Sequence, residues 1–426
     1  MTATLAERLA DFAAALRFEH LPAAAVHEVK RRVIDSVGCV LGAWHTEPCA
    51  IARRVAARFS ATNGATLLGT RHAAPPDWAA FANGCLVRYL DYNDTYLSKE
   101  PAHPSDNIPA ALAAAEADHV TYGAFSSALA AATLFGLDAQ RMRHALGIAG
   151  VAGVALRQSR VGELSHWKGC AFANAARHGV YAALLAREGM TGPAPIFEGE
   201  KGFEKLVSGP LNDFKLPAVA SSLSREDFMI SKTSIKFWPA EYHGQSAIEA
   251  ALKLRDQIGD LSEIESILIE SHDAAVDIIG SEPEKWRPAT RETADHSLPY
   301  LVAVALTDGT VAAKQFSLER LADPRLIELV QRVKVQRRAD LSARYPEAVA
   351  NVVTAQLQGG RTQSQRVDYP HGHAKSPLTD AEVEAKFHTL TDPLLGRERA
   401  EAALSWLWRL EQARELGEFP PLIEVS

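Results

Sequence analysis

Apolar residues recur every three or four positions up to about residue 230, and this spacing constrains the fold more than any other feature. It is the period of an α-helix with one buried face. Many of these residues are alanine, whose small side chain lets helices pack tightly in a bundle. Gly147, Gly150 and Gly153 would allow the same close approach, and Asp138 is placed to cap a helix. The expected helices cover residues 4–16, 24–42, 78–90, 108–117, 123–135, 140–156 and 170–187.

The spacing of apolar residues changes after Ser231, where apolar and polar residues begin to alternate. This period predicts strands at residues 264–271, 333–336, 351–358 and 362–367. Gly359-Gly360 stands between the last two and indicates a hairpin. Helical patterns at 245–257 and 297–306 lie among these strands, and another runs from Leu378 through Arg414.

Two domains follow from this order of elements. The chain has 426 residues, more than one hydrophobic core usually serves. We predict a mainly α protein in which both chain ends, residues 1–231 and 378–426, build an all-helical domain. Residues 232–377 are expected to form a smaller, inserted α+β lid domain. The cleft between two domains is a natural place for a ligand.

The charge balance excludes some partners. The net charge is −7, from 52 acidic and 45 basic side chains, which gives no basic footprint for nucleic acid. An anionic substrate would therefore need a local group of cations. Four cysteines without a Cys-x-x-Cys pair indicate reduced thiols. Since neither a signal peptide nor a membrane span is apparent, we expect a cytoplasmic protein without a membrane partner.

The densest polar segment of the N-terminal half runs from Asp91 to Asn107 and contains Thr95, Lys99 and His103. It follows one expected helix and precedes another, so it is a loop on a rigid frame, where functional residues concentrate. Helix capping would explain an aspartate or a threonine equally well. The histidine and the lysine add nothing to a cap and favour a functional site.

Three further segments carry candidate residues. Lys168 stands at the start of the helix expected at 170–187, where the helix dipole disfavours a cation unless an anion binds there; a solvated lysine is the alternative. A proline-broken aromatic stretch at the domain junction carries Lys236 and His243, and its rings could exclude water from proton chemistry. Asp295 could orient the imidazole of His296 or simply cap the next helix.

Several familiar catalytic motifs are missing from the sequence. It has no Gly-x-Gly-x-x-Gly, no phosphate-binding loop ending in Lys-Ser/Thr, no Gly-x-Ser-x-Gly and no His-Glu-x-x-His. The cysteines are too scattered for an iron–sulfur cluster, and His371-Gly-His373 is a weak metal signal. We therefore expect no cofactor and no metal, which leaves proton transfer by side chains.

These segments, in this order, resemble the MmgE/PrpD family, which includes 2-methylcitrate dehydratase, cis-aconitate decarboxylase and iminodisuccinate epimerase. The resemblance covers nearly the whole chain, and its Pro-Ala-Glu-Tyr-His form is closer to the methylcitrate dehydratase branch. Its main marks are Leu90-Asp-Tyr-Asn-Asp-Thr95, His103-Pro-Ser105, His166-Trp-Lys-Gly169, Lys236-Phe-Trp-Pro-Ala-Glu-Tyr-His243 and Asp295-His-Ser-Leu-Pro-Tyr300.

The resemblance implies a homodimeric, cofactor-independent hydro-lyase that dehydrates a small anionic carboxylic acid, 2-methylcitrate or a related hydroxy-tricarboxylate. Asp91 or His103 is expected to be the base, and a histidine or Tyr300 the acid. The Asp91 loop and the two lysines should meet in one positively charged chamber sealed from solvent. The full set of expected site residues is Asp91, His103, His119 and Tyr300 for catalysis, with Thr95, Lys168, Lys236, His243 and His296 for substrate binding.

One departure from the family pattern keeps other functions open. Between Asn107 and Asp118 the family carries several more helical turns than this chain. Decarboxylation of a cis-aconitate-type acid, or epimerisation of an imino- or amino-dicarboxylate, would suit the same residues, because charge develops beside a carboxylate in each reaction. A non-catalytic binding protein with a shortened active-site segment is the remaining alternative.

Overall fold

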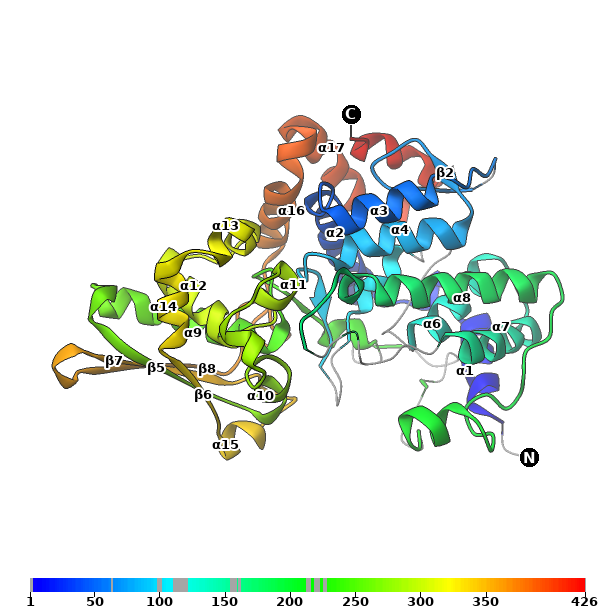
Figure 1. The fold of residues 1–426 in the computed structure, drawn as a ribbon. Coiled ribbons are helices and arrows are strands. Elements are labelled where there is room, and N and C mark those ends of the chain that lie inside the picture. The colour runs from blue at the N-terminus through cyan, green and yellow to red at the C-terminus, as the bar shows by residue number, and fades with distance from the viewer. Residues whose placement is uncertain are drawn as a thin grey trace.

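The computed structural model describes residues 3–62, 64–97, 102–109, 122–153, 159, 162–211, 216–217, 223–224 and 228–425. The described chain is mainly helical, with small sheets, as predicted. Figure 1 shows the helices of the first half at one end of the molecule and the largest sheet at the other. Among the described residues, no helix is both long and apolar enough to cross a membrane.

Among the described residues of the first half, six of the seven α-helices match the predicted pattern. Asp138 caps its helix as expected, because its side chain accepts from the Arg141 N–H at 2.8 Å. A Cβ on Gly153 would lie 2.5 Å from the Ala124 Cβ, so this glycine does allow a neighbouring helix to approach closely. The helix 47–56 was not predicted, and most of the helix expected at 108–117 lies outside the described residues. The helices are α1 (Leu5–Ala15), α2 (Ala23–Gly42), α3 (Glu47–Ala56), α4 (Pro76–Arg88), α6 (Tyr122–Leu134), α7 (Ala139–Ala152) and α8 (Ala171–Arg187).

The largest sheet has four strands in the order β6-β5-β7-β8. All four were predicted, as β5 (Ile264–Ser271), β6 (Val333–Arg337), β7 (Asn351–Leu357) and β8 (Thr362–Val367). β5 pairs with β6 in parallel, while β5–β7 and β7–β8 are antiparallel. The expected hairpin joins β7 to β8, where Gly359 has a φ of 74° and Gly360 a φ of 78°. Glycine adopts this left-handed backbone without strain.

Helices cover the sheet and connect its strands. α9 packs on β7 and β8, and α12 packs on α9 and β6 (Figure 1). α9 and α12 were predicted, whereas the shorter ones were not, because four to eight residues give too few periods to recognise. They are α9 (Gln245–Ile258), α10 (Asp273–Ile279), α11 (Arg291–Ala294), α12 (Leu298–Asp308), α13 (Leu318–Leu321), α14 (Pro324–Gln331) and α15 (Ala339–Ser342).

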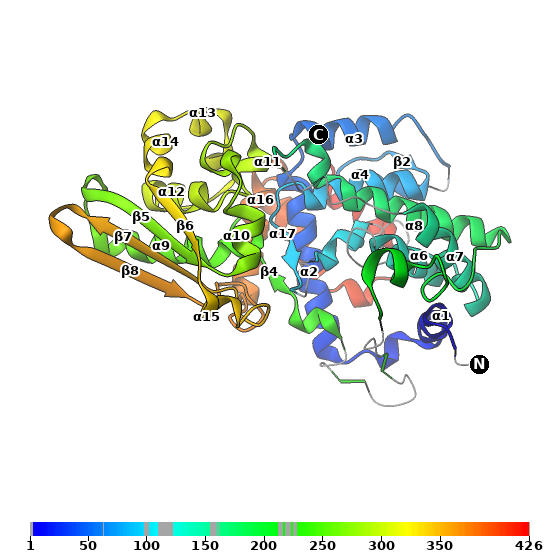
Figure 2. The same cartoon turned by 60° about the horizontal axis from the view of Figure 1, so that its bottom comes forward.

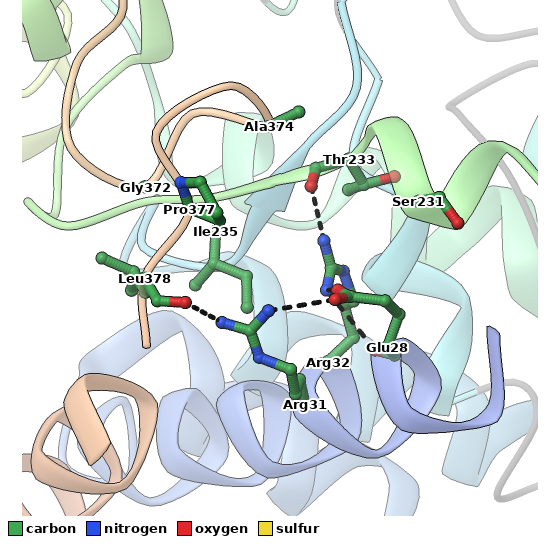
Figure 3. A pocket seen from close by; sticks show the side chains of 10 residues that line it. All are labelled: Glu28, Arg31, Arg32, Ser231, Thr233, Ile235, Gly372, Ala374, Pro377 and Leu378. Carbon is green, nitrogen blue, oxygen red and sulfur yellow. Dashed lines mark hydrogen bonds and ion pairs between the residues drawn. The ribbon is translucent and has the colours of Figure 1, made fainter. Parts of the chain in front are cut away.

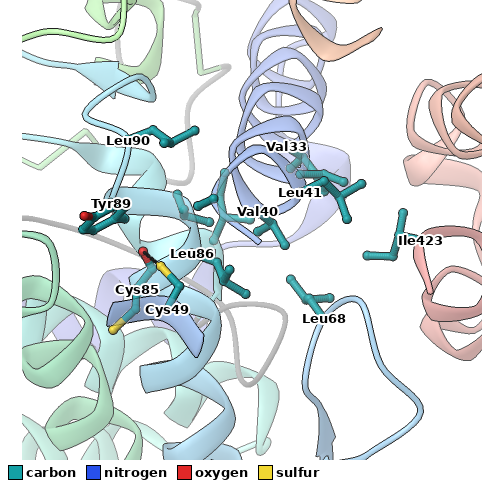
Figure 4. Close-up of a cluster of buried hydrophobic side chains, with 14 of the residues drawn as sticks. Val33, Val40, Leu41, Cys49, Leu68, Cys85, Leu86, Tyr89, Leu90 and Ile423 are labelled. Atoms are coloured by element: carbon teal, nitrogen blue, oxygen red, sulfur yellow. Dashed lines mark hydrogen bonds between the residues drawn. The ribbon is translucent and has the colours of Figure 1, made fainter. Parts of the chain in front are cut away.

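The C-terminal helices α16 (Asp380–Leu395) and α17 (Arg397–Leu407) return to the N-terminal part, where both contact α2 (Figure 2). One buried apolar cluster therefore combines Leu41 of α2 and Leu86 of α4 with Ile423 from the end of the chain (Figure 4). A second cluster draws only on residues between 238 and 367. We propose that these two clusters are the cores of the two domains expected from the sequence.

Candidate active site

The loop after α4 brings Asp91 beside the segment that carries Lys236. Two short antiparallel strands, β3 (Asp94–Thr95) and β4 (Ser234–Ile235), hold these segments together, with Thr95 opposite Ser234. Asp91 has a φ of 51°, the only positive value among the described residues other than glycine. Aspartate adopts this conformation more readily than most residues, and such backbone strain tends to be kept at functional sites. Lys236 fixes the strained residue, because its Nζ donates to the Asp91 carbonyl at 3.1 Å.

The Asp91 carboxylate is the centre of a buried charged cluster. Its Oδ1 contacts the Lys236 Nζ and lies 2.9 Å from Arg88 Nη1, and its Oδ2 lies 3.5 Å from both Lys168 Nζ and His296 Nδ1. Each of the five side chains is at most 5 % exposed. Burial by itself would raise the pKa of Asp91, but the guanidinium of Arg88 and then the two ammonium groups hold it well below its usual range. The carboxylate is therefore ionised at neutral pH.

For Lys236, in contrast to Asp91, the effect of burial on the pKa outweighs that of the oppositely charged neighbour. Burial lowers its pKa, and the neighbouring Arg88 lowers it further, while Asp91 opposes both. A lysine of lowered pKa inside a site is a group whose protonation can respond to a bound ligand. Both the position and the electrostatics of Lys236 therefore suit contact with an anion.

Lys168 lies in the 3₁₀ turn His166–Gly169 that leads into α8. It was expected to be either an anion-binding or a solvated lysine, and it is buried. Its Nζ donates to Asp295 Oδ1 at 2.6 Å and lies 3.1 Å from His296 Nδ1. Ligand atoms of Asp91, Asp295 and His296 lie within 4.8 Å of one another, a set that could hold a metal ion. The Lys168 ammonium already contacts all three, so a second cation there would have to displace it.

Asp295 orients the imidazole of His296, with 2.7 Å between Oδ1 and Nδ1. The capping alternative is wrong, because Ser297 caps α12 by accepting from the Tyr300 N–H at 3.1 Å. Burial, and then the charge of Lys168, lower the pKa of His296 to about 4. The ring is neutral at pH 7.

His103 joins the cluster through Arg88. Its Nδ1 lies 2.7 Å from the Asp94 carbonyl oxygen, which can only accept, so the proton is on Nδ1. Its Nε2 then accepts from Arg88 Nη2 at 3.0 Å. The Thr95 hydroxyl lies 3.2 Å from the same Nδ1. The structure therefore brings both predicted residues to the Asp91 cluster.

Sequence reasoning missed Arg88, although it contacts both Asp91 and His103. The available signal was an arginine at the end of the apolar helix α4, directly before the polar loop. Its presence does not make the cluster positive, because the described carboxylates balance the cations. The cations are Arg88, Lys168 and Lys236, and the carboxylates near them are Asp91, Asp106 and Asp295. In place of the expected positively charged chamber, the structure shows a buried cluster of charges that is close to neutral.

His243 belongs to a second polar cluster, defined by Glu241, His243, His272 and Tyr345. Glu241 accepts from the His243 Nδ1–H at 2.8 Å, and His243 Nε2 lies 3.3 Å from the Tyr345 hydroxyl. The rings of His272 and Tyr345 stack, with centroids 4.7 Å apart. Burial, and then His243, lower the pKa of His272 to about 3. The clusters are adjacent, because the Glu241 N–H donates to the Asp295 carbonyl at 2.9 Å.

Tyr300 lies in the hydrophobic cluster of residues 238–367. Its hydroxyl donates to the Gln315 carbonyl oxygen, and its ring packs on Phe316. The charges that act on it come from Arg320, Asp308 and Asp323. The structure therefore does not bring Tyr300 to Asp91 by any described contact. His119 and Lys99 lie outside the described residues.

A pocket lies where two chain segments, 231–235 and 372–378, cross from one part of the molecule to the other over α2 (Figure 3). Glu28 links two arginines there: Arg31 donates to the Leu378 carbonyl, and Arg32 donates to the Thr233 carbonyl. The two guanidinium groups therefore hold the crossing segments against α2. We therefore place the chemistry at the Asp91 cluster and not in this pocket.

Comparisons with known proteins agree with the sequence resemblance. The pattern of the MmgE/PrpD N-terminal domain matches residues 7–118 and 116–215, and that of the MmgE/PrpD C-terminal domain matches residues 238–411. The two N-terminal matches meet at residues 116–118, beside the segment that was expected from the resemblance to be shorter than in the family. Similar proteins include the 2-methylcitrate dehydratases of Salmonella typhimurium, 28% identical over 80% of this chain and 81% of that protein, and of Cupriavidus necator, 28% identical over 84% of each. The cis-aconitate decarboxylase of Mus musculus is 23% identical over 100% of this chain and 94% of its own length.

Proposed function

Because this chain belongs to the MmgE/PrpD family, we propose that it is a cofactor-independent lyase that removes water from 2-methylcitrate or a related hydroxy-tricarboxylate. The observation that carries the proposal is the contact of one ionised carboxylate, Asp91, with two buried lysines, Lys168 and Lys236. Three distant segments supply these groups. Such an arrangement suits a small polyanion, whose carboxylates can replace those of the protein beside the two ammonium groups.

Elimination of water needs a base for a proton beside a carboxylate and stabilisation of the negative charge that develops there. In the proposal, Lys168 and Lys236 hold substrate carboxylates and supply that stabilisation. Drawing an ammonium group away from Asp91 would raise the pKa of Asp91 from its depressed range. Asp91 would then become a stronger base only when substrate is bound.

The departing hydroxyl needs a proton donor, and the geometry favours a histidine over Tyr300. The Tyr300 hydroxyl is engaged by the Gln315 carbonyl, and burial raises its pKa. His103 and His296 both contact members of the Asp91 cluster and are the candidates for this role. Because the His296 ring is neutral at pH 7, it could act as the donor only after taking up a proton when the substrate binds.

His103→Ala tests whether the Arg88–His103 side of the cluster takes part. We expect turnover to fall by about 10²–10⁴-fold, the usual contribution of a positioned acid or base, while circular dichroism shows an intact fold. His45→Ala, at an exposed position, is the matched control and should keep full turnover. Unchanged turnover in His103→Ala would refute the role of His103.

The reaction itself is tested by an NMR time course with 2-methylcitrate, citrate and cis-aconitate offered together. Loss of water from 2-methylcitrate or citrate supports the proposal. Release of carbon dioxide from cis-aconitate would favour the decarboxylase alternative. The similarity of the whole chain to the mouse decarboxylase is the reason to include this substrate. Binding of these acids by calorimetry without any turnover would instead indicate a binding protein.

We also propose, from the family resemblance, that the chain acts as a homodimer in the cytoplasm. Light scattering of the purified protein tests the dimer, and a mass equal to that of one chain would exclude it. Fractionation of cells that express the chain tests its location.

A further inference from the structure

Lys386, on α16, lies directly behind the Asp91 cluster and was not expected from the sequence to take part. Its side chain is 6 % exposed, and its Nζ lies 2.6 Å from Asp35 Oδ1 on α2. The same Nζ donates to the Tyr92 carbonyl at 2.6 Å and to the Lys236 carbonyl at 2.9 Å. An ammonium group has three protons, so these three acceptors account for all of them.

Two of these acceptors belong to the backbone of the candidate active site. Tyr92 follows Asp91, the residue with the strained positive φ, and the other carbonyl is that of Lys236 itself. Lys236 in turn contacts both the carbonyl and the carboxylate of Asp91. One ammonium group thus holds, from behind, the two backbone segments whose side chains meet in the site.

The carboxylate of Asp35 explains why the Lys386 ammonium group can be buried at this position. Its carboxylate is fully buried, and burial raises its pKa, while Lys386, and after it Arg32 and Arg31, act in the opposite direction. The Tyr92 ring adds to this, with its centroid 3.7 Å from the Lys386 Nζ, a favourable position for a cation over an aromatic face. The surroundings therefore fix the position of Lys386 on two sides.

We propose that Lys386 is a positioning residue for Asp91 and Lys236, with Asp35 as its counter-charge. This inference rests on the proposed function, because it concerns the same site. Lys386 does not touch the reacting atoms; it keeps the Asp91 turn and the Lys236 segment at a fixed separation. A displacement of either would separate the carboxylate from the ammonium group that binds substrate.

The test compares Lys386→Met with the double variant Asp35→Asn/Lys386→Met. The single variant leaves Asp35 buried without its partner, so we expect a lower urea midpoint together with a fall in kcat/KM on 2-methylcitrate. The double variant has no unpaired charge, so the midpoint should recover in part, although the Tyr92 and Lys236 carbonyls still lack the Lys386 donor. Its kcat/KM should stay about 10²-fold low, mainly through kcat, which is the effect expected of roughly 1 Å of misplacement.

Recovery of kcat/KM together with the urea midpoint in the double variant would overturn the proposal, since Lys386 would then matter only for folding. Lys30→Met is the matched control, because Lys30 also joins α2 to the C-terminal end through a carboxylate, Glu411, and a carbonyl, that of Trp408. It should keep the kcat/KM of the unmodified protein.

A crystal structure of the double variant tests the positioning without any turnover. We expect Lys236 to lose its contact with the Asp91 carbonyl. An unchanged Asp91 turn with both Lys236 contacts intact would overturn the proposal. If the unmodified protein acts on none of the three acids, the proposed function fails, whereas this structural outcome still decides the role of Lys386.

Discussion

Both polar clusters are largely buried, with Tyr345 only partly so, yet burial has a different outcome for Asp91 and for His272. In the Asp91 cluster, unlike charges neutralise one another, so Asp91 stays ionised although burial alone would favour its neutral form. In the Glu241 cluster, His272 contacts no carboxylate among the residues that the structure describes, and burial keeps its ring neutral, with a pKa of about 3. Burial therefore does not decide the charge of a group by itself; the partners do. The Asp91 cluster holds two lysine ammonium groups that could bind an anionic substrate.

Of the substitutions that test this comparison, Asp91→Asn should have the largest effect on both stability and turnover. Asparagine tolerates the positive φ, so the substitution removes the charge with little change to the turn. Lys168, Lys236 and Arg88 lose their shared partner, and we expect a loss of about 3–5 kcal/mol in unfolding free energy, as for other broken buried pairs. Turnover should fall by at least about 10²–10⁴-fold.

Urea unfolding and single-turnover kinetics measure these two effects. Asp273→Asn is the control, because the Asp273 side chain is 60% exposed and its partner is the surface residue Arg337. An Asp91→Asn variant as stable and as active as the control would show that the charge of Asp91 is not the organising feature of the site.

The substitution His272→Asn tests the contrast between Asp91 and His272 through the dependence of folding stability on pH. The folded pKa of His272, about 3, lies below its unfolded value, so the unfolded chain takes up the proton first as the pH falls. Stability is then lost between about pH 6.5 and pH 3, and by pH 5 this one residue should cost about 2 kcal/mol. Asparagine keeps the cap on α10 that His272 supplies to the Ala275 N–H, but does not titrate.

Urea unfolding at pH 7.5 and pH 5 should therefore show a smaller acid loss in His272→Asn than in the unmodified protein. The exposed His45→Asn should keep the original pH dependence. An identical slope in all three proteins would mean that the buried imidazole is not held neutral.

Glu241→Gln should have the smallest effect. The pKa of Glu241 is lowered to about 2, because His243 outweighs the effect of burial, so its contribution to stability is present above about pH 4.5 and lost as the pH falls toward 2. A glutamine oxygen can still accept from the His243 Nδ1–H, and we expect a loss of about 1–2 kcal/mol at pH 7. Turnover should change far less than in Asp91→Asn. A loss of turnover equal to that of Asp91→Asn would place the Glu241 cluster in the catalytic machinery.

Much of the fold could be predicted because period and turn chemistry are local. The four strands of the largest sheet, the hairpin glycines and the Asp138 cap were recognisable from their own neighbours in the sequence. The short helices α10 and α14 were not, since a segment of seven or eight residues shows little periodicity. The division into two domains stays a proposal that the two separate apolar clusters support.

The sequence by itself was enough to propose Asp91, His103, Lys168, Lys236 and His296 as site residues, because they are polar groups in motifs beside helix ends. Only the tertiary structure decided their protonation states and the contacts that fix their positions. Arg88, Asp35 and Lys386 lie in helices of ordinary pattern, and their importance depends on partners far away in the chain, such as Lys386 and Tyr92. Protonation follows from burial and from the distance to other charges, and neither quantity exists until the chain has folded.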